Sequence, residues 1–137
     1  KNAVLIAKKN AKRHKMQHNT NFFNKSLASN FIQKFDLIVS NPPYIMSKDI
    51  KNLNDDIKKY EPRIALDGGN DGLDLIKKII YKTKNILKFK GKLALEIGNE
   101  QNKKVSTILE KNNFKIEHAI KDYKDNVRCV ISTYLNN

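Results

Sequence analysis

Apolar and polar positions follow two periods along this chain, and each period predicts a different kind of secondary structure. Apolar side chains that recur every three or four residues predict helices, because such positions share one helix face. This pattern occupies residues 1–17, 71–87 and 101–112. Short runs that are apolar or alternating predict strands. These runs occupy residues 20–23, 35–40, 92–97, 114–121 and 127–135.

The order of these elements predicts an α/β fold. Strands that alternate with helices are typical of a mostly parallel sheet with helices on both faces. The nearly continuous apolar run at residues 35–40 fits a strand that is buried on both faces. The last two strands, joined by residues 122–126, predict an antiparallel hairpin at one edge. Ligands bind such sheets beyond the carboxyl ends of the strands, so we expect the site at residues 41–44 and 96–98.

Composition and charge narrow the function classes. A chain of 137 residues fits one domain. Its 27 basic and 14 acidic residues give a net charge of +13, which attracts anions, including nucleic acid. Only three of the basic residues are arginines, however, and specific phosphate recognition usually depends on arginine. No apolar run approaches the roughly 20 residues of a membrane helix, and the single Cys129, which cannot form an internal disulfide, fits a cytoplasmic protein.

Several kinds of catalytic site are not indicated. The histidines His14 and His18 lie four residues apart in a predicted helix without a nearby acidic ligand, and His118 is far from both. The chain contains neither a phosphate-binding loop nor a G-x-S-x-G nucleophile motif. We therefore expect no metal site.

The sequence Asn41-Pro42-Pro43-Tyr44, directly after the apolar run, is the most specific chemical signal. Prolines have no N–H and fixed φ angles, so they hold a rigid turn. The Asn41 side-chain oxygen and the Pro42 carbonyl can each accept one hydrogen of a planar NH₂ group, and Tyr44 can stack on that plane. Two acceptors raise the electron density on a poorly nucleophilic nitrogen and orient it for attack. A rigid turn with a packed tyrosine is the structural alternative.

Two segments together identify a family. The stretch FDLIVSNPPYI (residues 35–45) resembles motif IV of S-adenosylmethionine-dependent amino-methyltransferases, which act on adenine, guanine or glutamine nitrogens. The stretch YEPRIALDGGNDGL (residues 60–73) resembles the YEPxxALxGGxDGL segment of the HemK/PrmC glutamine N5-methyltransferases. The segment LALEIG (residues 93–98) and Gln101 also match that family, and the resemblance covers essentially the whole chain.

The resemblance implies a Rossmann-like methyltransferase sheet, S-adenosylmethionine as cofactor and no metal. The expected substrate is the glutamine of the Gly-Gly-Gln motif in class-1 peptide chain release factors. Asn41, Pro42, Pro43 and Tyr44 would bind that glutamine, and Asn41 would also lie against the cofactor. Leu27 aligns with a position that packs on the adenine, and Glu61 falls in the segment expected to brace the substrate loop, where it could equally be a buried structural partner of Arg63.

The chain also departs from the family pattern. It lacks the D/E-x-G-x-G-x-G segment that holds the methionine part of the cofactor, and the ribose-binding acidic residue would fall before Lys1. We therefore expect residues 1–137 to be the C-terminal portion of a class I catalytic domain, inactive alone. Three alternatives stay open: a nucleic-acid amino-methyltransferase acting on adenine N6 or guanine N2, a ribosomal-protein glutamine methyltransferase, and a non-catalytic remnant that binds release factor.

Overall fold

The computed structural model describes residues 2–27, 29 and 31–136, which form two compact units, Lys1–Asn30 and Phe31–Asn137. In the first unit, helix α1 (Asn2–Arg13) has a largely basic, exposed surface and buries Ala11. It ends before Lys15, whose φ of 57° cannot continue a helix. The strand predicted at residues 20–23 is wrong, because that segment has no regular secondary structure.

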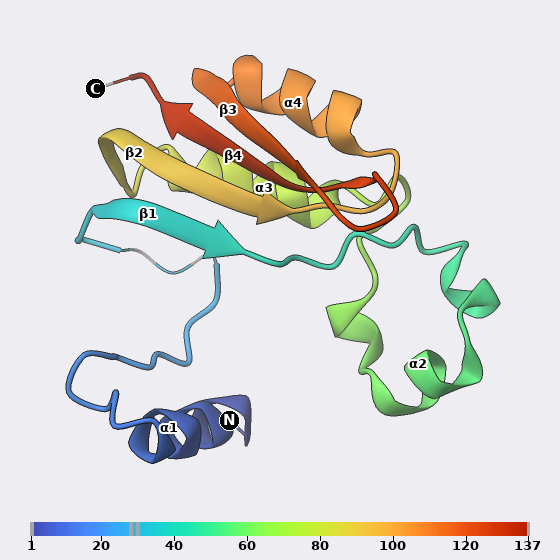
Figure 1. The fold of residues 1–137 in the computed structure, drawn as a ribbon, viewed down its shortest axis with the longest axis horizontal. Coiled ribbons are helices and arrows are strands. Elements are labelled where there is room, and N and C mark those ends of the chain that lie inside the picture. The colour runs from blue at the N-terminus through green and yellow to red at the C-terminus, as the bar shows by residue number, and fades with distance from the viewer. Residues whose placement is uncertain (1, 28, 30, 137) are drawn as a thin grey trace. The chain divides into compact units, whose positions relative to one another are not determined.

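The second unit contains a four-stranded sheet in the order β1-β2-β4-β3 (Figure 1). The strands are β1 (Phe35–Ser40), β2 (Leu87–Glu96), β3 (Phe114–Lys121) and β4 (Val127–Tyr134). Only β1 and β2 pair in parallel; β2 with β4 and β4 with β3 are antiparallel. The predicted α/β class and the terminal hairpin are confirmed, but the described sheet is mixed rather than mostly parallel.

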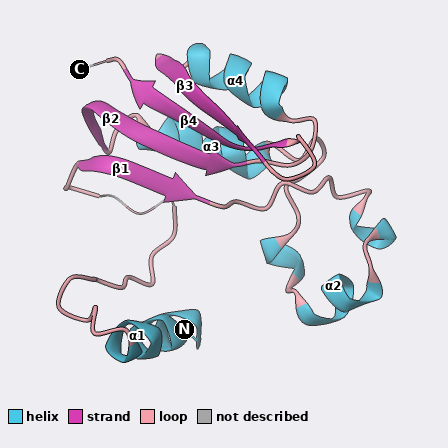
Figure 2. Cartoon of the chain, in the orientation of Figure 1, coloured by secondary structure: helices cyan, strands magenta, loops and turns pink. Residues whose placement is uncertain are grey.

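The helices of the second unit differ in role (Figure 2). Helices α3 (Asp74–Thr83) and α4 (Asn102–Glu110) connect strands, as predicted, whereas the helices between β1 and α3 are short. They are the 3-10 helix η1 (Ile50–Asn52), the α-helix α2 (Asp55–Tyr60) and the 3-10 helix η2 (Arg63–Ala65). The helix predicted from residue 71 starts at Asp74, because the Asp71 carboxylate accepts the Leu73 N–H in a turn that precedes it.

One face of the sheet forms the core. Leu93, Leu95 and Ile97 are completely buried, while the residues between them along the chain are half-buried or exposed. Successive side chains of a strand point to opposite faces, so this series defines one packed face. The side chains that share this core are less than 10% exposed: Ile76, Ile80, Val105, Leu109, Phe114 and Val130. Each stabilises the unit by about 1.5–3 kcal/mol.

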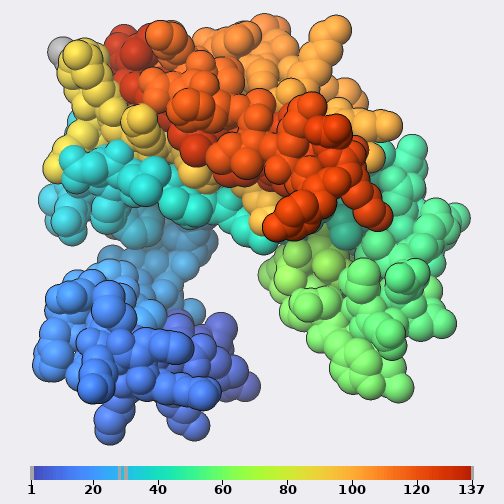
Figure 3. Space-filling view, in the orientation of Figure 1, coloured from blue at the N-terminus to red at the C-terminus, as the bar shows by residue number. Residues whose placement is uncertain are grey.

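The prediction that β1 is buried on both faces is wrong. Leu37 is 54% exposed and Val39 is 71% exposed, and the side chains of β1, cyan in Figure 3, lie at the surface in that view. Val39 pairs with Ala94, next to buried Leu93, which places Val39 on the face opposite the core. Helix α4 packs against β3, β4 and α3, so both helices cover the core face. An apolar run predicts a strand, but it does not indicate whether one or both faces of that strand are covered by other elements.

Strand β2 begins earlier than predicted. Its pairing with β1 jumps from Phe35↔Leu87 to Leu37↔Lys92, and Lys90 adopts a φ of 59° at this irregularity. Residues 90–91 therefore form a distortion within one long strand, which begins at Leu87 rather than at the predicted residue 92. In the described part of the chain, no helix is both long and apolar enough to span a membrane.

Candidate functional site

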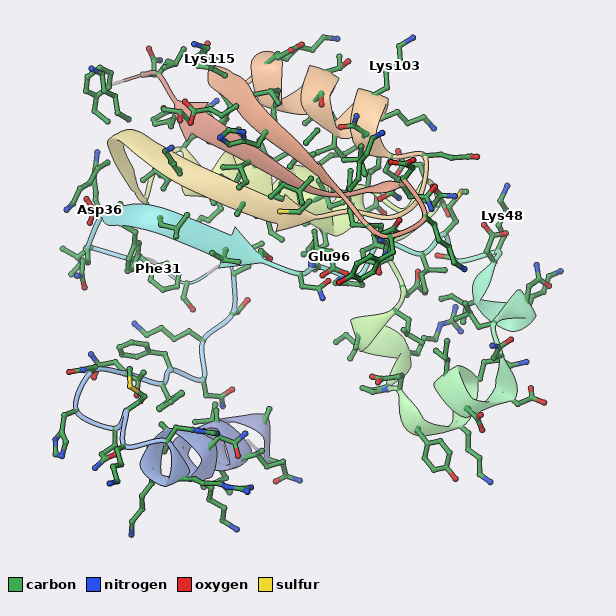
Figure 4. The ribbon with its side chains drawn as sticks, viewed as in Figure 1. Phe31, Asp36, Lys48, Glu96, Lys103 and Lys115 are labelled. Carbon is green, nitrogen blue, oxygen red and sulfur yellow. The ribbon has the colours of Figure 1, made fainter. Side chains whose placement is uncertain are left out.

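Three strand ends meet at one edge of the sheet. β1 ends at Ser40, which pairs with Leu95 of the parallel strand β2, and Glu96 at the end of β2 pairs with Cys129 near the start of β4. Glu96 is labelled in Figure 4 beside the end of β1. Residues 41–44, here called the NPPY turn, leave β1 at this edge. The predicted position of the site is thus where the topology brings these three strands together.

The NPPY turn leaves acceptor groups available. Pro42 is buried, Pro43 and Tyr44 are half-buried, and Asn41 is exposed. Within the described residues, neither the Asn41 side chain nor the Pro42 carbonyl takes part in a hydrogen bond. The two prolines lack N–H groups, so nothing in the turn itself competes for these oxygens. Both acceptors required by the amide-binding prediction are therefore free.

The turn is held in place by the segment that follows η2. The Ile45 N–H donates to the Leu66 carbonyl at 3.1 Å, and the Gly68 N–H donates back to the Ile45 carbonyl at 2.8 Å. The Ser47 hydroxyl donates to the Asp67 carboxylate at 2.6 Å. These contacts form a short parallel bridge, so the two sequence segments that carried the family resemblance lie side by side.

Two glycines permit this close approach. A Cβ on Gly68 would lie 2.8 Å from Tyr44 Cα, and one on Gly72 would collide with the Tyr44 carbonyl oxygen. Gly72 also has a φ of 71°, which side-chain-bearing residues rarely adopt. Any larger residue here would separate the loop from the NPPY turn.

Gln101 joins three segments beneath the turn. Its side-chain oxygen accepts the Gly98 N–H at 2.9 Å, and its Nε2 donates to the carbonyls of Tyr44 at 2.9 Å and Gly72 at 3.3 Å. Gln101 is only 9% exposed. The sequence comparison matched Gln101 to the family but did not assign it this structural role.

The Tyr44 side chain is bound by Glu96, which lies in the range 96–98 where the site was expected, and by Arg128, which the sequence analysis did not single out. Arg128 Nη2 donates to the Tyr44 hydroxyl at 2.8 Å, and that hydroxyl donates to Glu96 Oε1 at 3.2 Å. The Arg128 guanidinium carbon also lies 5.3 Å from the centre of the Tyr44 ring. One feature of the sequence could have drawn attention to Arg128, because it is one of three arginines among 27 basic residues.

The local environment shifts the pKa values of two titratable groups near the NPPY turn. The pKa of Asp67 lies below its ordinary value because the Ser47 hydroxyl, the Gly69 N–H and Arg63 all favour the ionised carboxylate. The pKa of the Cys129 thiol is raised, first by burial and then by the negative charge of Glu96. Asp67 therefore holds the loop as an anion, whereas Cys129 is disfavoured as a thiolate.

Three cavities border the NPPY turn. The smallest, about 180 Å³, is lined by residues 41–45 with Ala65 and Leu66. A second, about 350 Å³, is also lined by Asn41, together with β1, β2 and β4 residues that include Glu96 and Arg128. A third, about 560 Å³, is bordered by Tyr44, Gln101 and Arg128. Asn41 thus faces the first two spaces, and Tyr44 faces the first and the third.

Two further site residues were predicted, Glu61 and Leu27. Glu61 is exposed rather than buried, and Arg63 pairs with Asp67 at 3.2 Å instead of with Glu61. Leu27 belongs to the first unit, whose position relative to Asn41 is not defined. Across the described ranges, no three His, Cys, Asp or Glu side chains gather closely enough to hold a metal ion.

Comparisons with known proteins agree with this chemistry. A model of the family described as Eco57I restriction-modification methylase matches residues 2–122. Among solved structures, a methyltransferase from Pyrococcus furiosus aligns with a TM-score of 0.58 at 16% identity, over 93% of this chain and 57% of that one. At this identity the likeness concerns the fold alone, and it confirms the predicted methyltransferase-like sheet.

Curated relatives carry more specific names. Over 100 residues the chain is 46% identical to the release factor glutamine methyltransferase of Clostridium acetobutylicum. This alignment covers 73% of this chain and 35% of that protein. It is 42% identical over 132 residues to the protein of the same name from Fusobacterium nucleatum, at 95% and 37% coverage. A ribosomal protein uL3 glutamine methyltransferase from Francisella tularensis is 40% identical over 100 residues, at 72% and 32% coverage. The chain thus spans about a third of each relative's length.

Proposed function

Since the chain belongs to the family of Eco57I restriction-modification methylases, we propose that the complete protein is an S-adenosylmethionine-dependent methyltransferase that acts on a glutamine side-chain amide. The predicted resemblance to glutamine methyltransferases is confirmed by the relatives of that name. The proposed substrate is the glutamine of the Gly-Gly-Gln motif in class-1 release factors, and residues 1–137 are proposed as the C-terminal portion of a class I catalytic domain. A translation factor as substrate fits a cytoplasmic enzyme.

The two free acceptors of the NPPY turn carry this proposal. The Asn41 side-chain oxygen and the Pro42 carbonyl each accept one hydrogen of the amide NH₂ group, and among the described residues no donor competes for them. Delocalisation of its lone pair makes an amide nitrogen a poor nucleophile. Accepting both of its hydrogens shifts electron density onto the nitrogen and fixes the direction of the lone pair. The Tyr44 ring then lies along the flat amide group.

The cofactor supplies an electrophilic methyl group when it is bound. Asn41 fits a position between amide and cofactor, because it lines both the 180 Å³ cavity and the 350 Å³ cavity. Asn41 and Leu27 are the residues of this chain proposed to contact the cofactor. The bound cofactor would supply the methyl group, whose bond to the sulfonium sulfur breaks as its bond to the amide nitrogen forms. The nitrogen gives up one of its two hydrogens as a proton to solvent, and the Asn41 oxygen accepts the hydrogen that remains.

The size of the small cavity favours a slender side chain over a nucleotide. Ligand pockets usually have volumes of about 300–1,000 Å³, whereas the space beside residues 41–45 is about 180 Å³. A glutamine side chain enters such a space end-on. A base with its attached sugar needs more room beside the acceptors.

One further substrate has a specific observation behind it. The Francisella tularensis relative is named for ribosomal protein uL3, and it is 40% identical to this chain. The amide chemistry would be the same, and only the protein that presents the glutamine would differ. Nucleic acid has weaker support as a substrate. The basic residues behind the +13 charge are almost all lysines, and the relatives at 40–46% identity are named for glutamine.

The test is a comparison of substrates with the complete protein and methyl-labelled cofactor. Release factor, ribosomal protein, adenine-containing DNA and rRNA are offered separately. We expect label on release factor only, and no label when its target glutamine is replaced by glutamate, which has no amide nitrogen. Preferential labelling of the ribosomal protein would transfer the assignment to that substrate, and efficient labelling of DNA or rRNA would overturn the glutamine proposal.

A further inference from the structure

We infer that Arg128 and Glu96 are positioning residues that fix the Tyr44 ring as a wall of the amide pocket. This inference rests on the proposed function, in which Tyr44 lies against the substrate amide. Neither Arg128 nor Glu96 lines the 180 Å³ cavity, whereas Tyr44 does. Their influence on the amide therefore passes through the Tyr44 side chain.

The hydrogen bonds among Tyr44, Arg128 and Glu96 allow only one assignment of donors and acceptors. A guanidinium group has only donors, so the Tyr44 hydroxyl oxygen must accept from Arg128. The single hydroxyl proton is then directed to the Glu96 carboxylate, which has only acceptors when ionised. The bond from Arg128 is 2.8 Å long and has a charged donor, and such bonds are stronger than neutral ones, whereas the bond to Glu96 is longer at 3.2 Å. The phenol ring is consequently held at its far end as well as at its backbone.

Arg128 is itself held from a second direction. Its Nη2 lies 4.0 Å from Glu96 Oε1, and its Nε lies 4.0 Å from Asp122 Oδ2 in the turn between β3 and β4. Asp122 also accepts the N–H groups of Lys124 and Asn126, which fixes that turn. The hairpin at the end of the chain, remote from the NPPY turn in sequence, thus sets the orientation of Tyr44.

This arrangement explains a feature that a packed tyrosine alone would not require. A tyrosine in a purely structural turn needs one hydrogen-bond partner, and water can supply it at a half-buried position. Here two charged side chains from β2 and β4 converge on one hydroxyl, with the Arg128 guanidinium over the ring as well. A ring that must present one face to a planar amide benefits from this restraint.

The test uses the complete protein with four variants: Tyr44→Phe, Arg128→Met, the double variant, and Glu96→Gln. Lys121→Met is the matched control, since Lys121 lies on the same hairpin and pairs only with exposed Asp125. We expect Arg128→Met, which removes one charged hydrogen bond, to lower kcat about tenfold, and Tyr44→Phe, which removes both bonds of the hydroxyl, to lower it at least as much. The double variant should be no slower than the slower single variant, and Glu96→Gln, which retains an acceptor, should stay within about threefold of wild type.

Two further readouts separate positioning from other roles. The KM for release factor, the affinity for the cofactor and the melting temperature should stay close to wild type in every variant. In NMR spectra of ring-labelled tyrosine, the Tyr44 signals should shift and broaden in Arg128→Met but not in Lys121→Met. This readout needs no turnover, so it tests the inference even if release factor proves not to be the substrate.

The inference would be overturned by multiplicative losses of kcat in the double variant, because Arg128 would then act independently of Tyr44. Loss of cofactor affinity in Arg128→Met would overturn it too, since Arg128 also lines the 350 Å³ cavity and would be a direct contact there. Unchanged Tyr44 signals in Arg128→Met would show that the ring is held without Arg128.

Discussion

Replacing Gln101 with leucine should release the NPPY turn from the rest of the site. Leucine has nearly the same size but no polar atoms, so the Gly98 N–H and the carbonyls of Tyr44 and Gly72 all lose their partner. The position is 9% exposed, which leaves water little access to the three groups. We therefore expect a large local loss of stability.

The magnitude follows from these three bonds. A buried donor or acceptor that loses its partner costs about 1–3 kcal/mol. With about 1 kcal/mol for each group, local opening around Gly98 becomes easier by about 3 kcal/mol. Because each 1.4 kcal/mol changes an equilibrium tenfold, the Gly98 amide should exchange with solvent about 100-fold faster.

Hydrogen–deuterium exchange of the complete protein measures this directly. Gln101→Glu is an informative companion, because its carboxylate still accepts the Gly98 N–H but repels the two carbonyls. We expect Gly98 to be better protected in Gln101→Glu than in Gln101→Leu. Lys103→Ala, an exposed change on the same helix, should leave Gly98 unaffected. Exchange of Gly98 in Gln101→Leu within about threefold of wild type would refute this reasoning.

Three further predictions concern the same edge. Gly72→Ala should lower the melting temperature through a loss of about 2–3 kcal/mol, from its positive φ and backbone collision, while exposed Asn70→Ala should not. The pKa of Asp67 is lowered in the folded protein, so the hydrogen bonds of its carboxylate stabilise the loop fully at pH values above the ordinary carboxyl range. This stabilisation is lost as the pH falls through the lowered pKa, and hydrogen exchange in the loop should then become faster. Asp67→Asn should remove this pH dependence. Cys129 should react slowly with iodoacetamide at neutral pH because its pKa is raised, and Glu96→Gln should speed that reaction.

Much of this architecture could be predicted from local sequence patterns. The stripe formed by Ile76, Ile79 and Ile80 recurs at helical spacing, and all three side chains are buried in α3. The strand at residues 35–40 and the final hairpin were predicted for the same reason, since their side-chain periods are local properties. The position of the NPPY turn followed from one further rule, that strand ends gather at one sheet edge.

The remaining features depend on contacts between distant parts of the chain. Arg128 lies 84 residues from Tyr44, and nothing in its own neighbours indicates that it reaches the tyrosine hydroxyl. Exposure of Val39 depends on what covers the sheet rather than on the apolar run itself. Of the two alternatives for Glu61, a buried partner of Arg63 is wrong, and a polar side chain in a long loop has no period from which burial could be predicted.

The most direct test of the central claim is the rate of N5-methylglutamine formation by the complete protein when Asn41 is changed. We expect Asn41→Leu to lower kcat by about 100-fold or more, because one of two acceptors on the amide hydrogens is lost. Asn41→Asp should retain clearly more activity, since its carboxylate still accepts an N–H. Mass spectrometry of the release-factor peptide identifies the product. Near-normal turnover by Asn41→Leu with an intact fold would contradict the account.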